Sequence, residues 1–283
     1  MNSANGAAVV VGVDGSEPAT RAVRLAAREA RRRNRPLRVV HGFIWPLLRV
    51  PVSAPAGSPP GAGLRNQAGQ LVADAVAVAE AESPGLRVTG EIIDGEAAAV
   101  LLGESPTAAV IVLGDRGLGG FAALVVGSVA VQVASYADCP VLIARGTGHA
   151  DGPVVAGVDG STLSRAAVEF AAETASARGA PLHVVHARPA PRGRGDATRA
   201  EEDERVLTEA LAGIGERWPD LTVHAEAVRA KPVAALTTAS AEAQLVVVGR
   251  QGRGELGGLL LGSVSQAILH RSACPVAVVR PPD

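Results

Sequence analysis

Two segments of the sequence have the glycine spacing of a loop that could hold a phosphate group. Gly114 and Gly117 are followed, after nine intervening residues, by Gly127 and Ser128. Glycine permits positive φ and a close approach of a ligand, and a Gly-Ser pair that opens a helix offers N–H groups to an anion. The pattern therefore indicates phosphate binding, with a tight turn and a capped helix start as the alternative. The same spacing occurs again at Gly249, Gly252, Gly262 and Ser263.

A carboxylate follows the first apolar run in each half of the chain. Asp14 comes after residues 7–13, and Asp159 comes after residues 154–158. A carboxylate at the end of a buried strand can accept hydrogen bonds from a ligand, or it can close an Asx turn within Val-Asp-Gly-Ser. Both interpretations stay open on the sequence alone.

The histidines do not indicate a catalytic or metal site. His41 and His186 end apolar runs, which favours a structural role. His183 and His186 are three residues apart, so on a strand they would face opposite sides of a sheet. We find no metal-ligand spacing among the six histidines, and no catalytic residue is predicted.

These residues occur twice because the chain contains an internal duplication. Asp14 matches Asp159 at an offset of 145 residues, whereas Gly114 matches Gly249 at an offset of 135. The first half therefore carries ten extra residues, which we place in the Pro/Gly-rich stretch 44–63. Two domains are predicted, residues 1–147 and residues 148–283, joined by a polar linker near residues 146–152.

Each half alternates apolar runs of strand length with helical segments. Short strands separated by helices are typical of a parallel sheet covered on both faces, whose ligands bind beyond the carboxyl ends of the strands. The predicted strands are residues 7–13, 37–40, 86–93, 109–113 and 141–144 in the first half, and 154–158, 182–186, 222–228, 245–248 and 276–279 in the second. The helices predicted in the first half are residues 17–34, 64–82, 96–104 and 128–136.

Composition narrows the function classes. The chain has 283 residues, is 47% hydrophobic, and has 27 basic against 28 acidic residues, which excludes a disordered chain and a nucleic-acid binder driven by bulk charge. Cys139 and Cys274 each precede a proline in an apolar run and are interpreted as buried core residues. The uncharged stretch 117–137 contains four glycines, and its counterpart carries charges, so no membrane span is predicted. The start lacks the basic region of a signal peptide, and we expect a cytoplasmic protein.

Common catalytic and nucleotide motifs do not match. The sequence contains no Walker A motif and no G-x-S-x-G elbow. Residues 252–257 match G-x-G-x-x-G, but they follow the fourth strand of their half rather than the first. An arginine-rich run is interpreted as a solvated helix end; its members are Arg28, Arg31, Arg32, Arg33 and Arg35.

The sequence resembles a tandem universal stress protein over essentially its whole length. The ATP-binding members of that family carry G-x-x-G, nine residues and G-(S/T) after the fourth strand, with an aspartate turn after the first, and both halves match. The resemblance implies two tandem Rossmann-like α/β domains, similar to adenine nucleotide alpha hydrolases. Each would be a five-stranded, mostly parallel sheet with helices on both faces. It also implies ATP as the ligand, with Mg²⁺ possible.

The resemblance also implies which residues contact the nucleotide. Gly12, Gly157, Asp14 and Asp159 would lie at its adenosine end, Gly42 and Ala187 would offer backbone hydrogen bonds to adenine, and Leu113 and Val248 would flank the ribose. Ribose and phosphates would lie against Gly114, Gly117, Gly127, Ser128 and Val129 in the first domain, and against Gly249, Gly252, Gly262, Ser263 and Val264 in the second.

The two glycine loops differ in charge. Asp115 places a carboxylate in the first loop, near the expected phosphates, whereas Arg250 and Arg253 occupy the second. Unless Mg²⁺ or Arg116 offsets the Asp115 charge, like-charge repulsion would weaken the first site. The sequence therefore predicts that the second site binds at least as tightly.

We expect a nucleotide-dependent stress or regulatory protein with at most slow ATP hydrolysis. An ATP-using enzyme of a related fold and a nucleotide-free interaction protein are the alternatives. As partners we expect an adenine nucleotide and an unidentified protein, but no nucleic acid and no membrane. The apolar fifth strands predict pairing between the domains or a homodimer.

Overall fold

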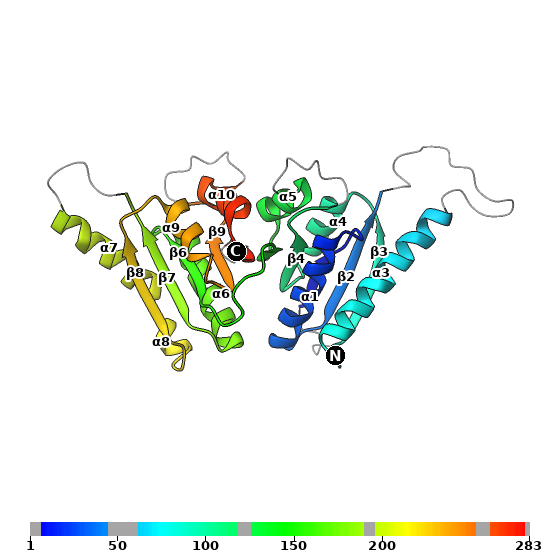
Figure 1. Cartoon of the computed structure of the whole chain (residues 1–283), viewed down its shortest axis with the longest axis horizontal. Coiled ribbons are helices and arrows are strands. Elements are labelled where there is room, and N and C mark those ends of the chain that lie inside the picture. The colour runs from blue at the N-terminus through cyan, green and yellow to red at the C-terminus, as the bar shows by residue number, and fades with distance from the viewer. Residues whose placement is uncertain (1–6, 45–61, 118–125, 190–195, 253–260, 281–283) are drawn as a thin grey trace. The chain divides into compact units, whose positions relative to one another are not determined.

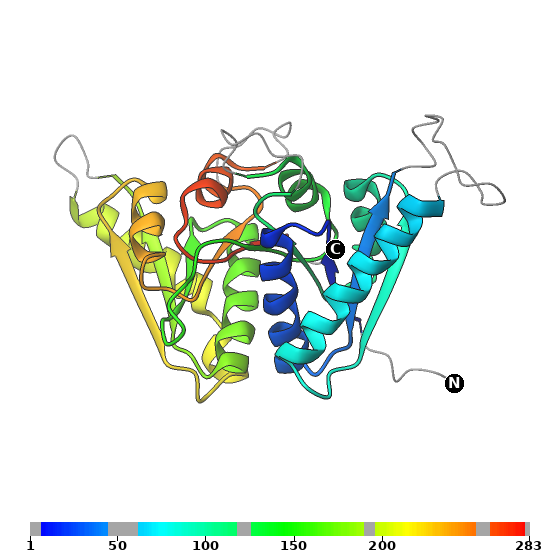
Figure 2. The same ribbon diagram turned by 45° about the vertical axis from the view of Figure 1, so that its right-hand side comes forward.

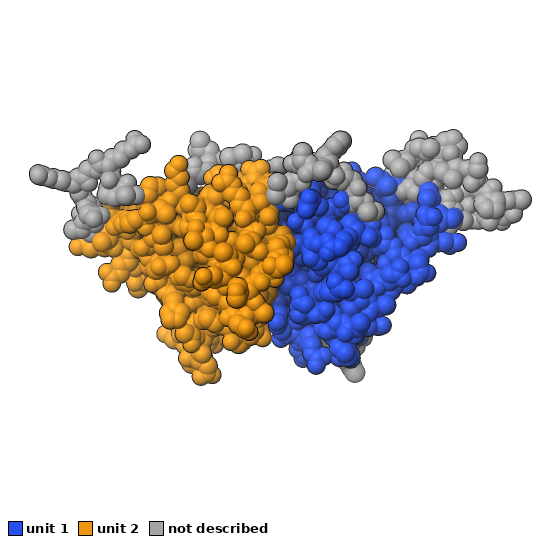
Figure 3. Space-filling view, in the orientation of Figure 1, with its two compact units in different colours: residues 1–144 blue, residues 145–283 orange. Residues whose placement is uncertain are grey.

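The computed structural model describes residues 7–44, 62–117, 126–189, 196–252 and 261–280. It divides into two compact units, residues 1–144 and residues 145–283, which are coloured separately in Figure 3. The predicted insert in stretch 44–63 falls mostly on residues 45–61, which lie outside the described residues.

Unit 1 contains a doubly wound parallel sheet. Its strands are β1 (Val9–Gly12), β2 (Leu37–Phe43), β3 (Val88–Asp94), β4 (Val110–Gly114) and β5 (Val141–Ala144), and its helices are α1 (Glu17–Arg32), α3 (Ala62–Glu82), α4 (Ala97–Glu104) and α5 (Ser128–Tyr136). The strand order within the unit is β3-β2-β1-β4-β5, and every neighbouring pair is parallel. The order reverses between β1 and β4, so the switch point lies beyond their carboxyl ends.

Unit 2 repeats this topology. Its strands are β6 (Val154–Val158), β7 (Leu182–Ala187), β8 (Val223–Val228), β9 (Leu245–Gly249) and β10 (Val276–Val279), and its helices are α6 (Thr162–Arg178), α7 (Asp196–Leu211), the short α8 (Ile214–Arg217), α9 (Pro232–Ala239) and α10 (Ser263–Arg271). The order is β8-β7-β6-β9-β10, again with parallel neighbours. The predicted fold class is thereby confirmed for both halves.

The helices of unit 1 form two packed pairs. Helix α1 contacts α3, and α4 contacts α5. In Figures 1 and 2, α1 and α3 lie side by side. Right-handed crossovers on either side of the switch point place the two pairs on opposite faces of the sheet. The strands between them are consequently buried on both faces, and Val9, Val11 and Ile111 have no exposed surface.

Helix α1 begins and ends where its sequence provides caps. The Ser16 hydroxyl accepts a hydrogen bond from the Ala19 N–H at 3.2 Å. At the other end Asn34 has φ of 51°, a left-handed conformation that ends the helix. The helix therefore stops at Arg32, two residues before the predicted end. Unit 2 uses Ser161 as its cap, 3.1 Å from the Ser164 N–H.

Candidate functional site

The turn after the first strand of each unit is built by its aspartate. The Ser16 N–H donates to Asp14 Oδ1 at 3.0 Å, and the Ser161 N–H donates to Asp159 Oδ1 at the same distance. Both are Asx turns, as one interpretation of the sequence predicted. Gly15 and Gly160 in these turns have φ of +84° and +78°, so glycine is required there.

The second carboxylate oxygen of each aspartate faces the glycine loop. A Cβ at Gly252 would lie 2.6 Å from Asp159 Oδ2, and a Cβ at Gly117 would also clash with Asp14 Oδ2. The turn after the first strand and the loop after the fourth strand are therefore in direct contact. Glycine keeps this approach open because it has no side chain.

The sequence-based argument from positive φ is wrong for the glycines of these loops. Gly114 and Gly117 are absent from the glycines with positive φ, as are their counterparts Gly249 and Gly252. The requirement for glycine is steric instead. A Cβ at Gly114 would lie 2.7 Å from the carbonyl carbon of Pro18, at the start of α1.

Each glycine loop closes against the helix that follows it. The Gly127 N–H donates to the Asp115 carbonyl at 2.7 Å, and the Gly262 N–H donates to the Arg250 carbonyl at 2.8 Å. These two N–H groups are therefore used within the protein rather than offered to a ligand. The first-turn N–H groups of α5 and α10, beginning at Ser128 and Ser263, have no carbonyl partner one turn earlier in their own helix.

A cavity lies at the switch point of each unit, and the two cavities correspond position by position. Their volumes are about 290 Å³ in unit 1 and about 220 Å³ in unit 2. Sixteen residues line each one, and the offsets of the duplication relate every lining position of one cavity to a lining position of the other. All eighteen site residues predicted from the sequence, nine per unit, belong to these linings.

The linings also include positions that the sequence argument missed. In unit 1 they include Val40, Ala97 and Leu101, and in unit 2 the matching Val185, Pro232 and Leu236. The wall formed by α4 and α9 could not be read from glycine spacing, because its residues are ordinary helix residues. The conserved offset between the halves is the signal that could have paired them.

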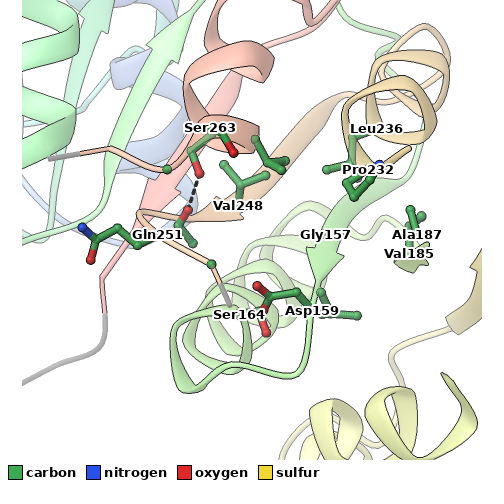
Figure 4. Close-up of a pocket in the computed structure, with 16 residues that line it drawn as sticks. Gly157, Asp159, Ser164, Val185, Ala187, Pro232, Leu236, Val248, Gln251 and Ser263 are labelled. Carbon is green, nitrogen blue, oxygen red and sulfur yellow. Dashed lines mark hydrogen bonds between the residues drawn. The ribbon is translucent and has the colours of Figure 1, made fainter. Parts of the chain in front are cut away.

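Polar and apolar residues lie largely on different sides of the unit 2 cavity. In Figure 4, Ser164, Gln251 and Ser263 lie on the left together with Val248, and Val185, Ala187, Pro232 and Leu236 lie on the right. The Ser265 hydroxyl donates to the Gly249 carbonyl at 2.6 Å, so its proton is already used. A cavity divided in this way fits a ligand with one flat apolar end and one polar end. The apolar side consists of Val185, Ala187, Pro232 and Leu236.

The premise that Asp115 faces the ligand is wrong. The Asp115 side chain is buried and accepts from Arg21 Nη2 at 3.3 Å, and Asp115 does not line the cavity. Arg116 lines it instead. In unit 2 the matching residue is Gln251, and Arg250 is not in the lining. Arg253, also used in that argument, lies outside the described residues. The charge difference of the described linings thus favours phosphate in unit 1.

The two strand-end histidines hold the backbone beside the aspartates. Nδ1 of His41 lies 2.8 Å from the Val13 carbonyl, and Nδ1 of His186 lies 2.9 Å from the Val158 carbonyl. A carbonyl oxygen only accepts, so each Nδ1 carries the proton. His186 Nε2 also lies 3.2 Å from the buried Asp203 carboxylate. Their role in the structure is positional, because each fixes the residue that precedes an aspartate of the site.

The described residues offer no group of three or more His, Cys, Asp or Glu side chains that could hold a metal ion. Both cysteines are buried, as predicted, and burial raises the pKa of the Cys139 thiol to about 12. Among the helices of the described ranges, none is long and apolar enough to cross a membrane.

Comparison with known proteins gives a family match in both halves. The model of the universal stress protein family matches residues 7–145 and residues 152–280. A universal stress protein of Mycolicibacterium smegmatis is 36% identical over 300 residues, covering 99% of each chain. One from Mycobacterium tuberculosis is 37% identical over 295 residues, covering 96% of each chain.

A solved structure shares the fold over nearly the whole chain. The universal stress protein of Archaeoglobus fulgidus superposes with a TM-score of 0.69 at 19% identity, covering 96% of this chain and 98% of that one. The matches to these relatives and to this structure therefore extend over both units of the chain.

Proposed function

This chain belongs to the universal stress protein family, and we propose that each of its two units binds an adenine nucleotide, with ATP as the ligand. Binding would act as a regulatory signal rather than as the first step of a fast reaction. The proposal unites the glycine loops, the two aspartates and the cavities at the switch points in one role.

The observation that carries the proposal is the correspondence of the two cavities. Ten of the sixteen paired lining positions hold identical residues. They include the aspartate of each turn and the three glycines and the serine of each glycine loop, which are Gly114, Gly117, Gly127 and Ser128 in unit 1. If the loop served only to form a turn, the close contact of Gly114 with Pro18 would be explained. The cavity with polar and apolar lining residues beside that loop in both units would not be.

The geometry supports an orientation for the nucleoside. The apolar side formed by Val185, Pro232 and Leu236 would contact the faces of the adenine ring. A carboxylate accepts hydrogen bonds and ribose hydroxyls donate them, so Asp159 would bind the ribose. Ala187 lies at the end of β7 and would present its backbone to the adenine edge. The same arrangement applies to Asp14 and its neighbours in unit 1.

The phosphates would extend from the cavity toward α5 or α10. The first-turn N–H groups of either helix and the Ser128 hydroxyl would face an anion there, and the helix dipole would add a favourable field. Each cavity is at or below the roughly 300 Å³ lower limit of ligand pockets, so it suits the nucleoside rather than the whole triphosphate. Mg²⁺ bound with ATP would neutralise phosphate charge.

We infer no fast catalysis. Among the described residues of the linings, Asp14 and Asp159 are the carboxylates, and each is held in an Asx turn by one oxygen. A general base has to reach an attacking water in line with the phosphate, whereas these aspartates lie at the ribose end of the proposed pose. Hydrolysis would therefore be slow.

Mass spectrometry of small molecules released from the purified chain tests the proposal. We expect ATP or ADP at up to two equivalents per chain, and thermal stabilisation of nucleotide-free protein by Mg-ATP. If no nucleotide is released and Mg-ATP gives no stabilisation, the alternative of a nucleotide-free interaction protein would be favoured. Rapid turnover that depends on a second substrate would instead identify an ATP-using enzyme.

The remaining expectations stay predictions. They are a cytoplasmic location, a domain limit at residues 147 and 148, an unidentified protein partner, and pairing or dimerisation through the apolar fifth strands. Light scattering of the purified chain measures the oligomeric state, and a mass of 28.5 kDa corresponds to the monomer.

A further inference from the structure

A second polar hollow lies at the opposite end of the unit 1 sheet from the nucleotide cavity. Its volume is about 410 Å³, and Arg31, Arg35 and Arg87 are among the residues that line it. These residues come from the end of α1 and from the loops that lead into β2 and β3. Strand β2 has seven residues, so roughly 20 Å of sheet separates the hollow from Gly42 at the other end.

Hydrogen-bonded turns hold the three arginines at this hollow. The Arg35 N–H donates to the Ala30 carbonyl at 2.8 Å, and Asn34 has left-handed φ, which together form a Schellman-type helix end. The Arg87 carbonyl accepts from the Leu37 N–H at 2.9 Å. Arg31 Nη1 donates to the Pro84 carbonyl at 2.8 Å, which directs its guanidinium toward the loop that carries Arg87.

The positive charge of the hollow is not neutralised within the described part of the chain. Neighbouring arginines have acidic partners: Arg28 pairs with Glu82 at 2.7 Å, and Arg32 pairs with Glu29 at 3.3 Å. No described carboxylate forms an ion pair with Arg31, Arg35 or Arg87. All three arginines are exposed, so water and salt weaken the repulsion between them, and an anion bound in the hollow would add a favourable interaction with each.

Unit 2 has the same backbone arrangement without the charge. Gly179 is left-handed, the Ala180 N–H donates to the Ala175 carbonyl at 3.0 Å, and the Leu182 N–H donates to the Thr222 carbonyl at 2.9 Å. The duplication relates Arg31, Arg35 and Arg87 to Ser176, Ala180 and Thr222. The fold therefore does not need arginine at these positions. The dipole of α1 favours a basic residue in its last turn, which accounts for Arg31 but not for Arg87 in the loop before β3.

We propose that this hollow, the arginine hollow of Arg31, Arg35 and Arg87, is a binding site for a small polyphosphate anion. Guanidinium groups bind phosphate oxygens through paired, charge-assisted hydrogen bonds. At roughly 30 Å³ per water molecule, the hollow is larger than a single phosphate group. The site is specific to unit 1 and separate from the nucleotide cavity.

Calorimetric titration of the full chain with tripolyphosphate at low salt tests the proposal. The variant Arg35→Gln/Arg87→Gln removes two charges from the hollow. Arg165→Gln/Arg205→Gln is the matched control, because it removes two exposed arginines of unit 2. Adenosine, which carries no phosphate, is titrated in parallel to follow the nucleotide cavities alone.

We expect the tripolyphosphate affinity of the hollow, followed by the amide signals of Asn34 and Gly85, to fall at least tenfold in the hollow variant and less than twofold in the control. Adenosine binding should be unchanged in both, and binding of tripolyphosphate at the starts of α5 and α10 is a separate event. In two-dimensional NMR spectra, tripolyphosphate should shift the amide signals of Asn34 and Gly85 but not that of Gly179. Three results would overturn the proposal. They are no binding of tripolyphosphate to the unmodified chain, an equal loss of tripolyphosphate affinity in both variants, and a hollow that binds a single-stranded oligonucleotide but not tripolyphosphate. Failure of adenosine binding alone would count against the proposed function and not against this site.

Discussion

Glycines of the site are distinguished from other glycines by what surrounds them. A Cβ at Gly252 would lie 2.6 Å from Asp159 Oδ2, and one at Gly103 in α4 would meet nothing within 4 Å. The spacing of glycines in the sequence cannot distinguish these two positions, because it does not show which glycine lies against another residue. Only the tertiary structure shows which glycines tolerate no side chain.

The substitution Gly252→Ala should weaken nucleotide binding in unit 2 by at least tenfold. The new methyl group would displace the Asp159 carboxylate, which corresponds to losing a charged hydrogen bond of about 1.5–3 kcal/mol. Isothermal titration should then show one strong site per chain. Gly103→Ala serves as the control and should leave both sites intact, since alanine only improves the helix by about 0.5–1 kcal/mol. Two unchanged sites in Gly252→Ala would contradict the prediction.

Charge at one matched lining position should set the preference for phosphate. Arg116 lines the cavity of unit 1, where unit 2 has Gln251. We expect Arg116→Gln to lower the ratio of ATP to AMP affinity at one site by roughly tenfold, and Gln251→Arg to raise it at the other. Titrations with both nucleotides measure the two ratios. Equal changes in ATP and AMP affinity would mean that the side chain does not reach the terminal phosphates.

At the scale of elements, the strands and helices follow from local sequence. The predicted strand 141–144 is β5, and the predicted helix 128–136 is α5. The apolar run of β5 and the Gly-Ser pair at the start of α5 are local signals, so the sequence alone indicates where these segments lie. Helix α1 ended earlier than predicted because Asn34 takes a left-handed conformation, which the arginine-rich run around it did not indicate.

Burial of the residues that lead into β5 has a consequence for alkaline stability. Cys139 has 7% exposure, and desolvation raises its pKa from 9.0 to about 12. Above pH 9 the unfolded chain loses this proton while the folded chain keeps it, so folding stability falls as pH rises toward 12. The variant Cys139→Ala lacks this loss.

The free-energy gap between the unmodified chain and Cys139→Ala should therefore shrink between pH 8 and pH 10.5, by up to about 1.4 kcal/mol per pH unit. Urea unfolding at a series of pH values measures it. A gap that stays constant over this range would show that the thiol ionises equally in both states.

At the scale of the molecule, the segment between the two folds belongs by its contacts to unit 2. Arg145 Nε donates to the Ser272 carbonyl at 2.7 Å, and its Nη1 donates to the Leu269 carbonyl at the end of α10. The His149 N–H donates to the Ala243 carbonyl at 3.0 Å. The two Arg145 bonds satisfy carbonyl groups at the end of α10 that would otherwise lack partners.

A fragment of residues 145–283 should consequently be more stable than a fragment of residues 148–283. The second fragment lacks Arg145 and with it these two hydrogen bonds, for which we expect a loss of about 1–3 kcal/mol in the free energy of unfolding. Urea unfolding of the two fragments measures the difference. Arg145→Gln in the longer fragment is the control and should reproduce most of it. Equal stabilities would favour the limit at residues 147 and 148.

The sequence by itself determined the duplicated α/β fold, the positions of most strands, and the glycine loops and aspartates of each site. It could do so because apolar periodicity, caps and glycine spacing are local signals, and because the second half repeats the first. The other predicted site residues came from the resemblance to the universal stress protein family. The offset between the halves also shows which residues of the two sites correspond.

Only the tertiary structure decided which way the loop side chains face. Asp115 and Arg116 are neighbours, yet Asp115 turns inward to Arg21 while Arg116 lines the cavity. Likewise, Arg31, Arg35 and Arg87 come together at one hollow although 52 residues separate Arg35 from Arg87. Such outcomes depend on contacts between residues far apart in the chain, which no local pattern specifies.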